Sequence, residues 1–326
     1  MLIELCATYF EKSRVFLLPF WRPVFLEVND VSDDLSKTAQ ELEKSADYRV
    51  LRRLVPRDVF MPVPNGEQTK VGVVLDVETT GLDPKKCEVI EMGMVKFAYL
   101  ADGRMTHVID SFGSLNEPTN PIPPEITDLT GITNEMVAGQ HIDASAVSAF
   151  VADANIIIAH NASFDRQFAE RYWPKFEHLP WGCSANEIDW RAHGFAGSRL
   201  AYLLMGAGLF HAAHRAVDDC RALLEILAMP LGKTGQPALA TLLDRARRNT
   251  VRIWAQGAPY DLKDELKKRR YRWNDGSDGR PKAWNIEIDD KLLAAEMKYL
   301  CEEIYGRNVD LLAQPITALK RFSNRS

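Results

Sequence analysis

The pattern of apolar and polar residues begins with one helical repeat and then changes to strands. Apolar positions recur at helical spacing from about Ser32 to Leu54, which predicts an amphipathic helix. Pro56, Pro62 and Pro64 follow this stretch and predict a linker, because proline cannot continue a helix. We therefore expect residues 1–69 to form an N-terminal helical extension and linker.

Three consecutive strands are predicted after residue 70. Residues 71–77 (VGVVLDV) are a short and almost continuously apolar run, which is typical of a strand in the centre of a sheet. Residues 88–100 (EVIEMGMVKFAYL) and 104–115 (RMTHVIDSFGSL) read as two more strands, with a turn at residues 101–103 between them. Strands joined by such short turns predict an antiparallel meander.

The rest of the region from 70 to 230 alternates helices with a further strand. Residues 155–160 (NIIIAH) predict a buried strand, and it leads directly into a helical pattern at residues 163–173 (SFDRQFAERYW). A strand that feeds a helix packing back on the sheet is an α/β arrangement. Further helices are predicted near residues 142–152, 200–209 and 217–229.

Residues 231–326 predict a small α+β module of their own. A basic helix is expected at residues 233–248, and strand, helix, strand and helix patterns follow as far as residue 306. Residues 241–272 contain ten Lys and Arg against four Asp and Glu, and aromatic residues such as Trp254, Trp273 and Trp284 occur within and after this stretch. Such a surface could bind phosphates and stack bases, or it could be a solvated basic face with tryptophans in a small core.

The composition is that of an ordinary globular protein. Of the 326 residues, 46% are hydrophobic and 26% charged, and the net charge of −5 gives no basic signature of nucleic-acid binding, although it does not exclude it. The five cysteines contain no C-x-x-C pair, which argues against a disulfide framework or a structural zinc and favours a reducing cytoplasm. Charged residues interrupt the apolar N-terminal stretches too often for a membrane span or a signal peptide, so a surface helix or a poorly defined leader is expected there.

Two carboxylates stand at the end of the first predicted strand. Asp76 and Glu78 are two residues apart and therefore point to the same face of the sheet. Two neighbouring acids repel each other unless a cation lies between them, and hard divalent ions such as Mg²⁺ or Mn²⁺ prefer oxygen ligands. Gly81 would let the backbone turn sharply where a substrate approaches. The alternative is a solvated strand end, although two acids against an apolar core would be costly.

Three further candidates occur at a strand exit and at a helix start. Asp165 follows the strand at 155–160, in the first turn of a helix, where α/β sheets place ligands. Asp219 opens the helix at 217–229, and His214 lies five residues earlier in the turn that enters it. Taken alone, Asp165 could merely complement the helix dipole, and His214 could be structural. Together with Asp76 and Glu78, these residues supply four acids and one histidine for one rim of a sheet.

In these residues the chain resembles the DEDDh branch of the DnaQ-like 3′-to-5′ exonucleases, the family that includes the proofreading epsilon subunit of bacterial DNA polymerase III. The resemblance covers roughly residues 70–228, and the order and spacing of its motifs agree. It is carried by VLDVETTGLDP, EVIEMGMVKF, PIPPEITDLTGIT, IIAHNASFDRQF and HRAVDDCRALLEIL.

The resemblance implies a fold and a set of site residues. The fold would be α/β, a ribonuclease H-like mixed sheet flanked by helices, with the exonuclease domain at residues 70–230. Asp76, Glu78, Asp165 and Asp219 look like the metal-binding acids and His214 looks like the general base, whereas Asp218 is off the family position. By the same likeness, the residues expected to line the pocket for the terminal nucleotide are Thr79, Thr80, Gly81, Leu82, Asn161 and Phe164.

The expected activity is metal-dependent removal of nucleotides from single-stranded 3′ ends. Two divalent metal ions, Mg²⁺ or Mn²⁺, would activate the attacking water and stabilise the leaving oxygen, and an imidazole can accept the water's proton near neutral pH. The substrate would be DNA in repair or proofreading, with nucleoside 5′-monophosphates as products and a DNA polymerase or another replication or repair protein as a partner. The alternatives are an RNA-directed exonuclease and a non-catalytic module that binds nucleic acid or tethers a polymerase. The motifs do not separate DNA from RNA, because that choice depends on how the pocket treats the 2′-hydroxyl.

Overall fold

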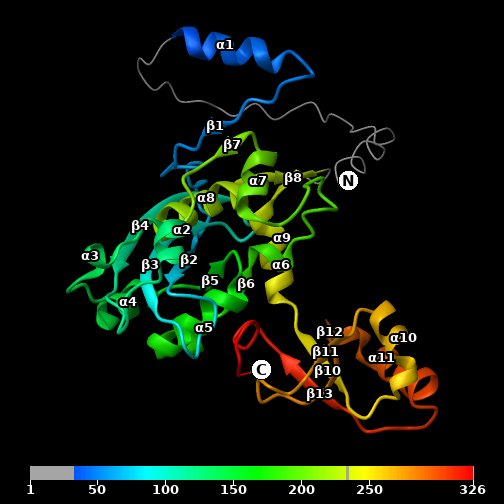
Figure 1. Cartoon of the computed structure of the whole chain (residues 1–326). Coiled ribbons are helices and arrows are strands. Elements are labelled where there is room, and N and C mark those ends of the chain that lie inside the picture. The colour runs from blue at the N-terminus through cyan, green and yellow to red at the C-terminus, as the bar shows by residue number, and fades with distance from the viewer. Residues whose placement is uncertain (1–32, 233–234, 326) are drawn as a thin grey trace, which may run out of the picture. The chain divides into compact units, whose positions relative to one another are not determined.

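A computed structural model describes residues 33–232 and 235–325 (Figure 1). The chain divides into two compact units, residues 1–50 and residues 51–326. In the first unit the described part contains helix α1 (Asp33–Glu43). The apolar stretches at residues 1–31, for which a surface helix or a leader is expected, lie outside the described residues.

The predicted helix from Ser32 to Leu54 is wrong beyond Glu43. The side-chain oxygen of Ser45 accepts a hydrogen bond from the backbone N–H of Asp47, and the chain leaves the helix there. Strand β1 (Arg52–Arg53) instead pairs in parallel with β7 (Leu209–Phe210), and Leu54 packs against a hydrophobic core. Pairing with a distant segment thus overrides the local helical repeat.

The main sheet has five strands in the order β4-β3-β2-β5-β6 (Figure 1). Strands β2 (Lys70–Thr79), β3 (Val89–Tyr99) and β4 (Met105–Leu115) pair antiparallel, which confirms the predicted meander. Strand β5 (Ile156–Ala159) pairs in parallel with β2, and β6 (Trp181–Cys183) pairs in parallel with β5. The sheet is therefore mixed, as expected from the sequence.

Helices and short turns connect these strands. Helices α5 (Ala162–Tyr172) and α8 (Ala216–Ala228) carry site residues, and both confirm predicted helices. The others are α2 (Pro124–Thr130), α3 (Asn134–Val137), α4 (Ala144–Phe150), a 3₁₀ turn (Pro174–His178), α6 (Ser184–Glu187), α7 (Leu200–Gly206) and α9 (Ala238–Arg247), with the strand pair β8 (Pro230–Leu231) and β9 (Gln236–Pro237) before α9.

Each face of the sheet packs against its own hydrophobic core. Alternation along β2 sends Val74 to one face, where it joins residues of α7, α8 and α9. Val73, Leu75 and Val77 point to the other face and pack with residues of α4 and α5. Asp76 and Glu78 therefore share the face that α8 covers.

Close contact between α8 and β3 depends on Gly93. A Cβ atom at this position would lie 2.3 Å from the backbone carbonyl carbon of Ala216, at the start of α8. A Cβ at Gly113 in β4 would likewise lie 2.9 Å from a methyl group of Val217. The two glycines let the first turn of α8, which carries Asp219, approach the strands directly.

The C-terminal module is built on a separate four-stranded sheet. Its order is β11-β12-β10-β13, formed by β11 (Arg272–Asn274), β12 (Ala283–Asp289), β10 (Thr250–Ala255) and β13 (Leu312–Ile316). Helices α10 (Lys263–Lys268) and α11 (Leu293–Tyr299) lie in the same module; 3₁₀ turns (Tyr260–Leu262 and Asp290–Leu292) precede them, and a π-helical turn (Leu300–Ile304) follows α11. The sequence pattern identified β10 and β12 and missed β11 and β13, of which β13 contains Pro315.

Candidate active site

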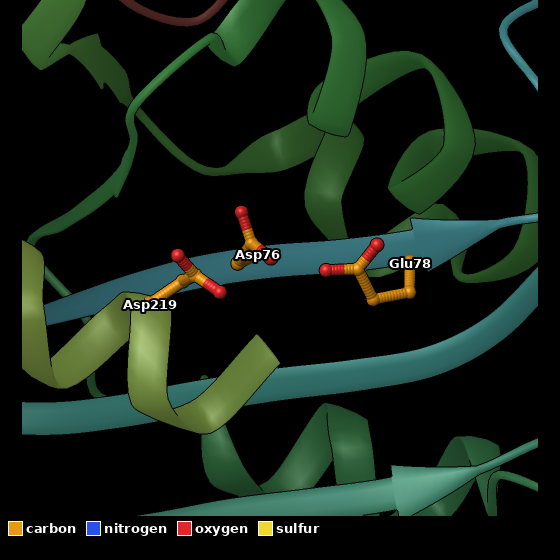
Figure 2. Close-up of side chains that lie close together, drawn as sticks. All are labelled: Asp76, Glu78 and Asp219. Carbon is orange, nitrogen blue, oxygen red and sulfur yellow. The ribbon is translucent and has the colours of Figure 1, made fainter. Parts of the chain in front are cut away.

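Three carboxylates meet where β2 ends and α8 begins. Asp76 and Glu78 project from the same face of β2, and Asp219 faces them from the first turn of α8 (Figure 2). One oxygen from each of the three side chains lies within 4.8 Å of the other two. This spacing is short enough for a single cation to contact all three residues.

Asp165 lies next to this group but uses one oxygen differently. Its side chain is 3% exposed, and Oδ1 accepts a hydrogen bond of 3.2 Å from the backbone N–H of Val77. Strand β5 pairs with β2 only from Gly72 to Val74, so the N–H of Val77 lies beyond that pairing and is satisfied by the aspartate. The bond fixes Asp165 against the segment of β2 that carries Asp76 and Glu78.

Burial and neighbouring charges raise the pKa values of Asp76 and Glu78, and burial raises that of Asp165. Burial is the main cause for Asp76, whose pKa lies well above its ordinary value, and the charges of Asp165, Asp219 and Glu78 add to it. Burial, together with Asp219 and Glu91, raises the pKa of Glu78 to about 8. Burial also raises the pKa of Asp165 to about 7. Without a cation, the cluster therefore retains protons at neutral pH.

An ion pair holds the start of α8 against β3. Glu91, paired with Glu78 across the β2–β3 register, accepts a hydrogen bond of 2.9 Å from the guanidinium of Arg215 and one of 3.0 Å from the backbone N–H of Ala216. The backbone N–H of Arg215 in turn donates to Oδ2 of Asp219 at 3.1 Å. These bonds fix the position of Asp219 relative to β2.

Two histidines stand before α8, and only one of them was expected. His214 is exposed and has a φ angle of 68°, a left-handed conformation that non-glycine residues rarely adopt. His211 instead contacts the cluster, because its Nε2 lies 2.8 Å from Oδ1 of Asp219. The structure therefore leaves His214 on an open turn and brings His211 to the acids.

The residues expected at the terminal nucleotide differ in how accessible they are. Thr79 is buried and donates to the carbonyl of Gly81 at 2.7 Å, while the hydroxyl of Thr80 accepts a hydrogen bond from the N–H of Glu88. The chain bends at Thr80, Gly81 and Leu82, and a Cβ at Gly81 would lie 2.8 Å from Sγ of Cys87. The bend agrees with the turn expected at Gly81, and the space that Cys87 takes is a second reason for glycine at this position.

The remaining candidates for nucleotide binding lie on the same rim. Leu82 is 84% exposed, so its side chain is free to contact a base. Asn161 precedes α5 and accepts a hydrogen bond from the hydroxyl of Ser163 at 3.0 Å. Phe164 is half-buried, with its ring 5.0 Å from the ring of Phe168 between centroids, and packs against the core below α5.

Glu91, Arg215 and His211 are the site residues that the sequence analysis missed. Glu91 could have been found as an acid at a buried position of a strand that otherwise reads as apolar. His211 could have been found as a second histidine, three residues before His214. Arg215 had no distinguishing signal, because an exposed arginine before a helix is common.

The donor set fits a divalent cation. Carboxylate oxygens are the ligands that Mg²⁺ and Mn²⁺ prefer, and a positive charge would oppose the repulsion that helps to raise the pKa values of Asp76 and Glu78. Asp76, Glu78 and Asp219 can hold such an ion, and Asp165 lies beside them.

Several basic side chains of the C-terminal module are paired with acids. Arg269 forms a two-pronged ion pair with Glu296, and Arg248 pairs with Asp244. Trp273 is 51% exposed and packs edge-on against Trp284, with the ring centroids 5.6 Å apart. Nucleic-acid binding by this module stays a prediction, as does the division of the chain at residues 69 and 230.

Comparisons with known proteins identify the family. Residues 73–227 match the family model RNase_T, described as Exonuclease. The chain is 32% identical over 162 residues to the DNA polymerase III subunit epsilon of Treponema pallidum, covering 46% of this chain and 72% of that protein. It is 34% identical over 162 residues to the PolC-type DNA polymerase III of Thermotoga petrophila, covering 47% of this chain but only 11% of the polymerase. The chain thus belongs to the DnaQ-like exonuclease family and corresponds to a small part of the PolC-type relatives.

A comparison with solved structures yields exonucleases. Exonuclease X, solved in complex with 5′ overhanging duplex DNA, is 23% identical, with 53% of this chain and 90% of that chain covered and a TM-score of 0.37. Exonuclease I of E. coli, solved with single-stranded DNA, is 14% identical, with 68% and 63% of the two chains covered and a TM-score of 0.45. Within the described residues, no helix is long and apolar enough to cross a membrane.

The raised pKa values predict how stability depends on pH in the absence of cations. Glu78 and Asp165 keep protons in the folded protein at pH values where the unfolded chain has released them, so the folded state binds more protons between about pH 4.5 and 8. This contribution to the free energy of unfolding therefore falls as the pH rises through that window.

Thermal melting in EDTA at a series of pH values should show a steeper loss of stability for the wild type than for Glu78→Gln. Adding Mn²⁺ should raise the melting temperature of the wild type most at pH 8. Equal pH profiles for the two proteins would contradict the prediction.

Proposed function

We propose that this chain is a metal-dependent 3′-to-5′ exonuclease that hydrolyses the terminal phosphodiester bonds of DNA and releases nucleoside 5′-monophosphates. The observation that supports this most directly is the convergence of Asp76, Glu78 and Asp219, with Asp165 fixed beside them. A solvated strand end does not account for it, because Asp165 is buried and the others are only partly exposed. Membership of the exonuclease family supports the reaction class, and the relationship to the DNA polymerase III subunits supports DNA as substrate.

In this proposal the carboxylates hold two divalent ions, Mg²⁺ or Mn²⁺, at the end of β2. When bound, such ions lower the pKa of an attacking water and neutralise the negative charge that develops on the leaving oxygen. Asp76, Glu78 and Asp219 would hold the ions with Asp165 beside them, since the charges of the other three acids all act on Asp76.

The water's proton would pass to His214. Its exposed position on the turn before α8 places the imidazole where solvent and substrate can reach it. His211 would serve a different purpose, because its hydrogen bond orients Asp219.

The terminal nucleotide would lie over the segment from Thr79 to Leu82. The exposed Leu82 side chain offers an apolar surface for the terminal base, and Phe164 and Asn161 lie at the start of α5 on the neighbouring strand exit. A single strand has to enter, because the scissile bond must reach the buried carboxylates, and a duplex end would fray first. A DNA polymerase or another repair protein would be the partner that delivers such ends.

Removing one of the convergent acids should abolish nucleotide release. Asp76→Asn keeps the shape of the side chain but removes the charge, so release of mononucleotides from a labelled single strand in Mg²⁺ or Mn²⁺ should fall to the level seen with EDTA. Asp153→Asn is the matched control, since Asp153 is an exposed acid that pairs with Lys96, and it should retain full activity. Parallel DNA and RNA strands with labels at either end would establish polarity and sugar preference. Wild-type activity in Asp76→Asn, or none in the wild type, would exclude the proposed reaction.

Replacing the two histidines one at a time should distinguish their roles. His214→Ala should lower kcat by about 10²- to 10⁴-fold, the usual contribution of a general base, with little change in KM. His211→Ala should cost less in kcat and should weaken activation by Mn²⁺, because it loosens Asp219. Steady-state kinetics at several Mn²⁺ concentrations would measure both effects. If His211→Ala gives the larger fall in kcat at saturating Mn²⁺, the base is His211 and the assignment of His214 is wrong.

A further inference from the structure

A cavity, here named the Tyr99 pocket, lies at the start of β2, at the opposite end of the strand from Asp76 and Glu78. Its volume is about 420 Å³, and it lies between the start of β2, the end of β3, helix α9 and the segment after β13. Its lining includes Lys70, Tyr99, Asn155, Leu243, Arg247 and Leu319. Lys70 precedes Asp76 by six residues, so the two ends of the strand are about 20 Å apart.

The lining of the Tyr99 pocket is positively charged. Lys70 and Arg247 contribute cations from two different elements, and no Asp or Glu belongs to the lining that the structure describes. This contrasts with the net charge of −5 over the whole chain. The side-chain oxygen of Asn155 accepts a hydrogen bond of 2.9 Å from the N–H of Val71, which leaves its amide N–H groups to donate to a ligand. The polar groups offered to a ligand are thus mainly donors.

Tyr99 adds a hydroxyl that lacks a partner. Its side chain is 2% exposed, and its ring packs against Phe97 with the centroids 5.8 Å apart. Among the described residues the hydroxyl makes no hydrogen bond, and its oxygen is not enclosed, because Trp254 Nε1 is the enclosed side-chain polar atom without a partner there. The hydroxyl is therefore accessible to a ligand in the pocket. Burial raises the pKa of Tyr99 and the charge of nearby Arg247 opposes that rise, so the hydroxyl is a protonated donor close to the guanidinium.

The remaining walls of the pocket are apolar. Ile156, Pro180, Leu243 and Leu319 provide a surface for the uncharged part of a ligand. The volume is at the lower end of the range for small-molecule sites, about 300–1,000 Å³. A bare ion would leave most of this space and all of the apolar surface unused.

We propose that the Tyr99 pocket binds a phosphate-bearing ligand of mononucleotide size, with the phosphate held by Arg247, Lys70 and the hydroxyl of Tyr99, and the remainder of the ligand on the apolar wall. The phosphate comes either from a free nucleotide or from one residue of a nucleic-acid strand. The inference does not depend on the proposed exonuclease activity, because none of the convergent acids lines the pocket.

Calorimetric titration of the full chain in EDTA tests the proposal, since chelation excludes cation-dependent binding at Asp76, Glu78 and Asp219. The probes are thymidine 5′-monophosphate, thymidine, inorganic phosphate and a short oligothymidylate without terminal phosphates. Arg247→Gln should weaken binding of the monophosphate at least about 10-fold, as expected for a charge-assisted contact. Tyr99→Phe, which keeps the packed ring, should weaken it about 3- to 10-fold.

Arg248→Gln is the matched control, because Arg248 is the adjacent cation on the chain, pairs with Asp244 and does not line the pocket. Arg248→Gln should bind the monophosphate like the wild type. Lys70→Gln should weaken binding of the monophosphate at least as much as Tyr99→Phe does. Circular dichroism melting checks that each variant is folded.

The outcomes of the titration are distinct. Tighter binding of the monophosphate than of thymidine or inorganic phosphate, lost in Arg247→Gln, identifies a free nucleotide as the ligand. Tighter binding of the oligothymidylate, lost in the same variant, identifies a strand phosphate. The proposal is wrong if no phosphate-bearing probe binds, if thymidine binds as well as its monophosphate, if inorganic phosphate binds as tightly as the larger probes, or if Arg248→Gln weakens binding as much as Arg247→Gln.

Discussion

The structure depends on holding several negative side chains together at one end of a buried strand. Burial opposes ionisation of Asp76, Glu78 and Asp165, and repulsion by neighbouring acids adds to it at Asp76 and Glu78, so the pKa values of all three are raised. The cluster persists because its members are fixed from outside: Asp165 by the backbone of β2, and Asp219 by the turn that begins α8. These acids lack a positive charge that would offset their own negative charges, and a divalent cation is the simplest group that supplies one.

Close packing of α8 against the sheet keeps these acids in position. Gly93 and Gly113 remove the side chains that would keep α8 away from the sheet, and Glu91 binds both Arg215 and the first N–H of the helix. The same alternation that directs Asp76 and Glu78 toward α8 directs Val73, Leu75 and Val77 into the opposite core. The strand therefore contributes to stability with one face and carries the acids on the other. At its far end the same strand begins at Lys70, which lines the cationic Tyr99 pocket.

Local patterns were enough to predict part of this architecture. Two-residue alternation put Asp76 and Glu78 on one face, and the apolar repeats predicted the meander and the helices that carry Asp165 and Asp219. Convergence of those segments could not be derived from spacing and came only from the likeness to a known family. Strands β6, β11 and β13 were missed because they have three to five residues and little alternation. The helix proposed as far as Leu54 failed because Arg52 and Arg53 pair with a strand more than 150 residues away. Glu91 and His211 were missed because their importance arises from tertiary contacts with Arg215 and Asp219.

The central claim, that these carboxylates converge in order to hold divalent cations, can be tested directly by crystallography. Crystals of the full chain grown or soaked in Mn²⁺ near pH 8, with diffraction data collected at the manganese absorption edge, would locate any bound ion. The account predicts an anomalous peak in contact with oxygens of Asp76, Glu78 and Asp219, and a second peak between Asp76 and Asp165 when a nucleotide is present. Ordered carboxylates with no anomalous density between them at millimolar Mn²⁺ would contradict it.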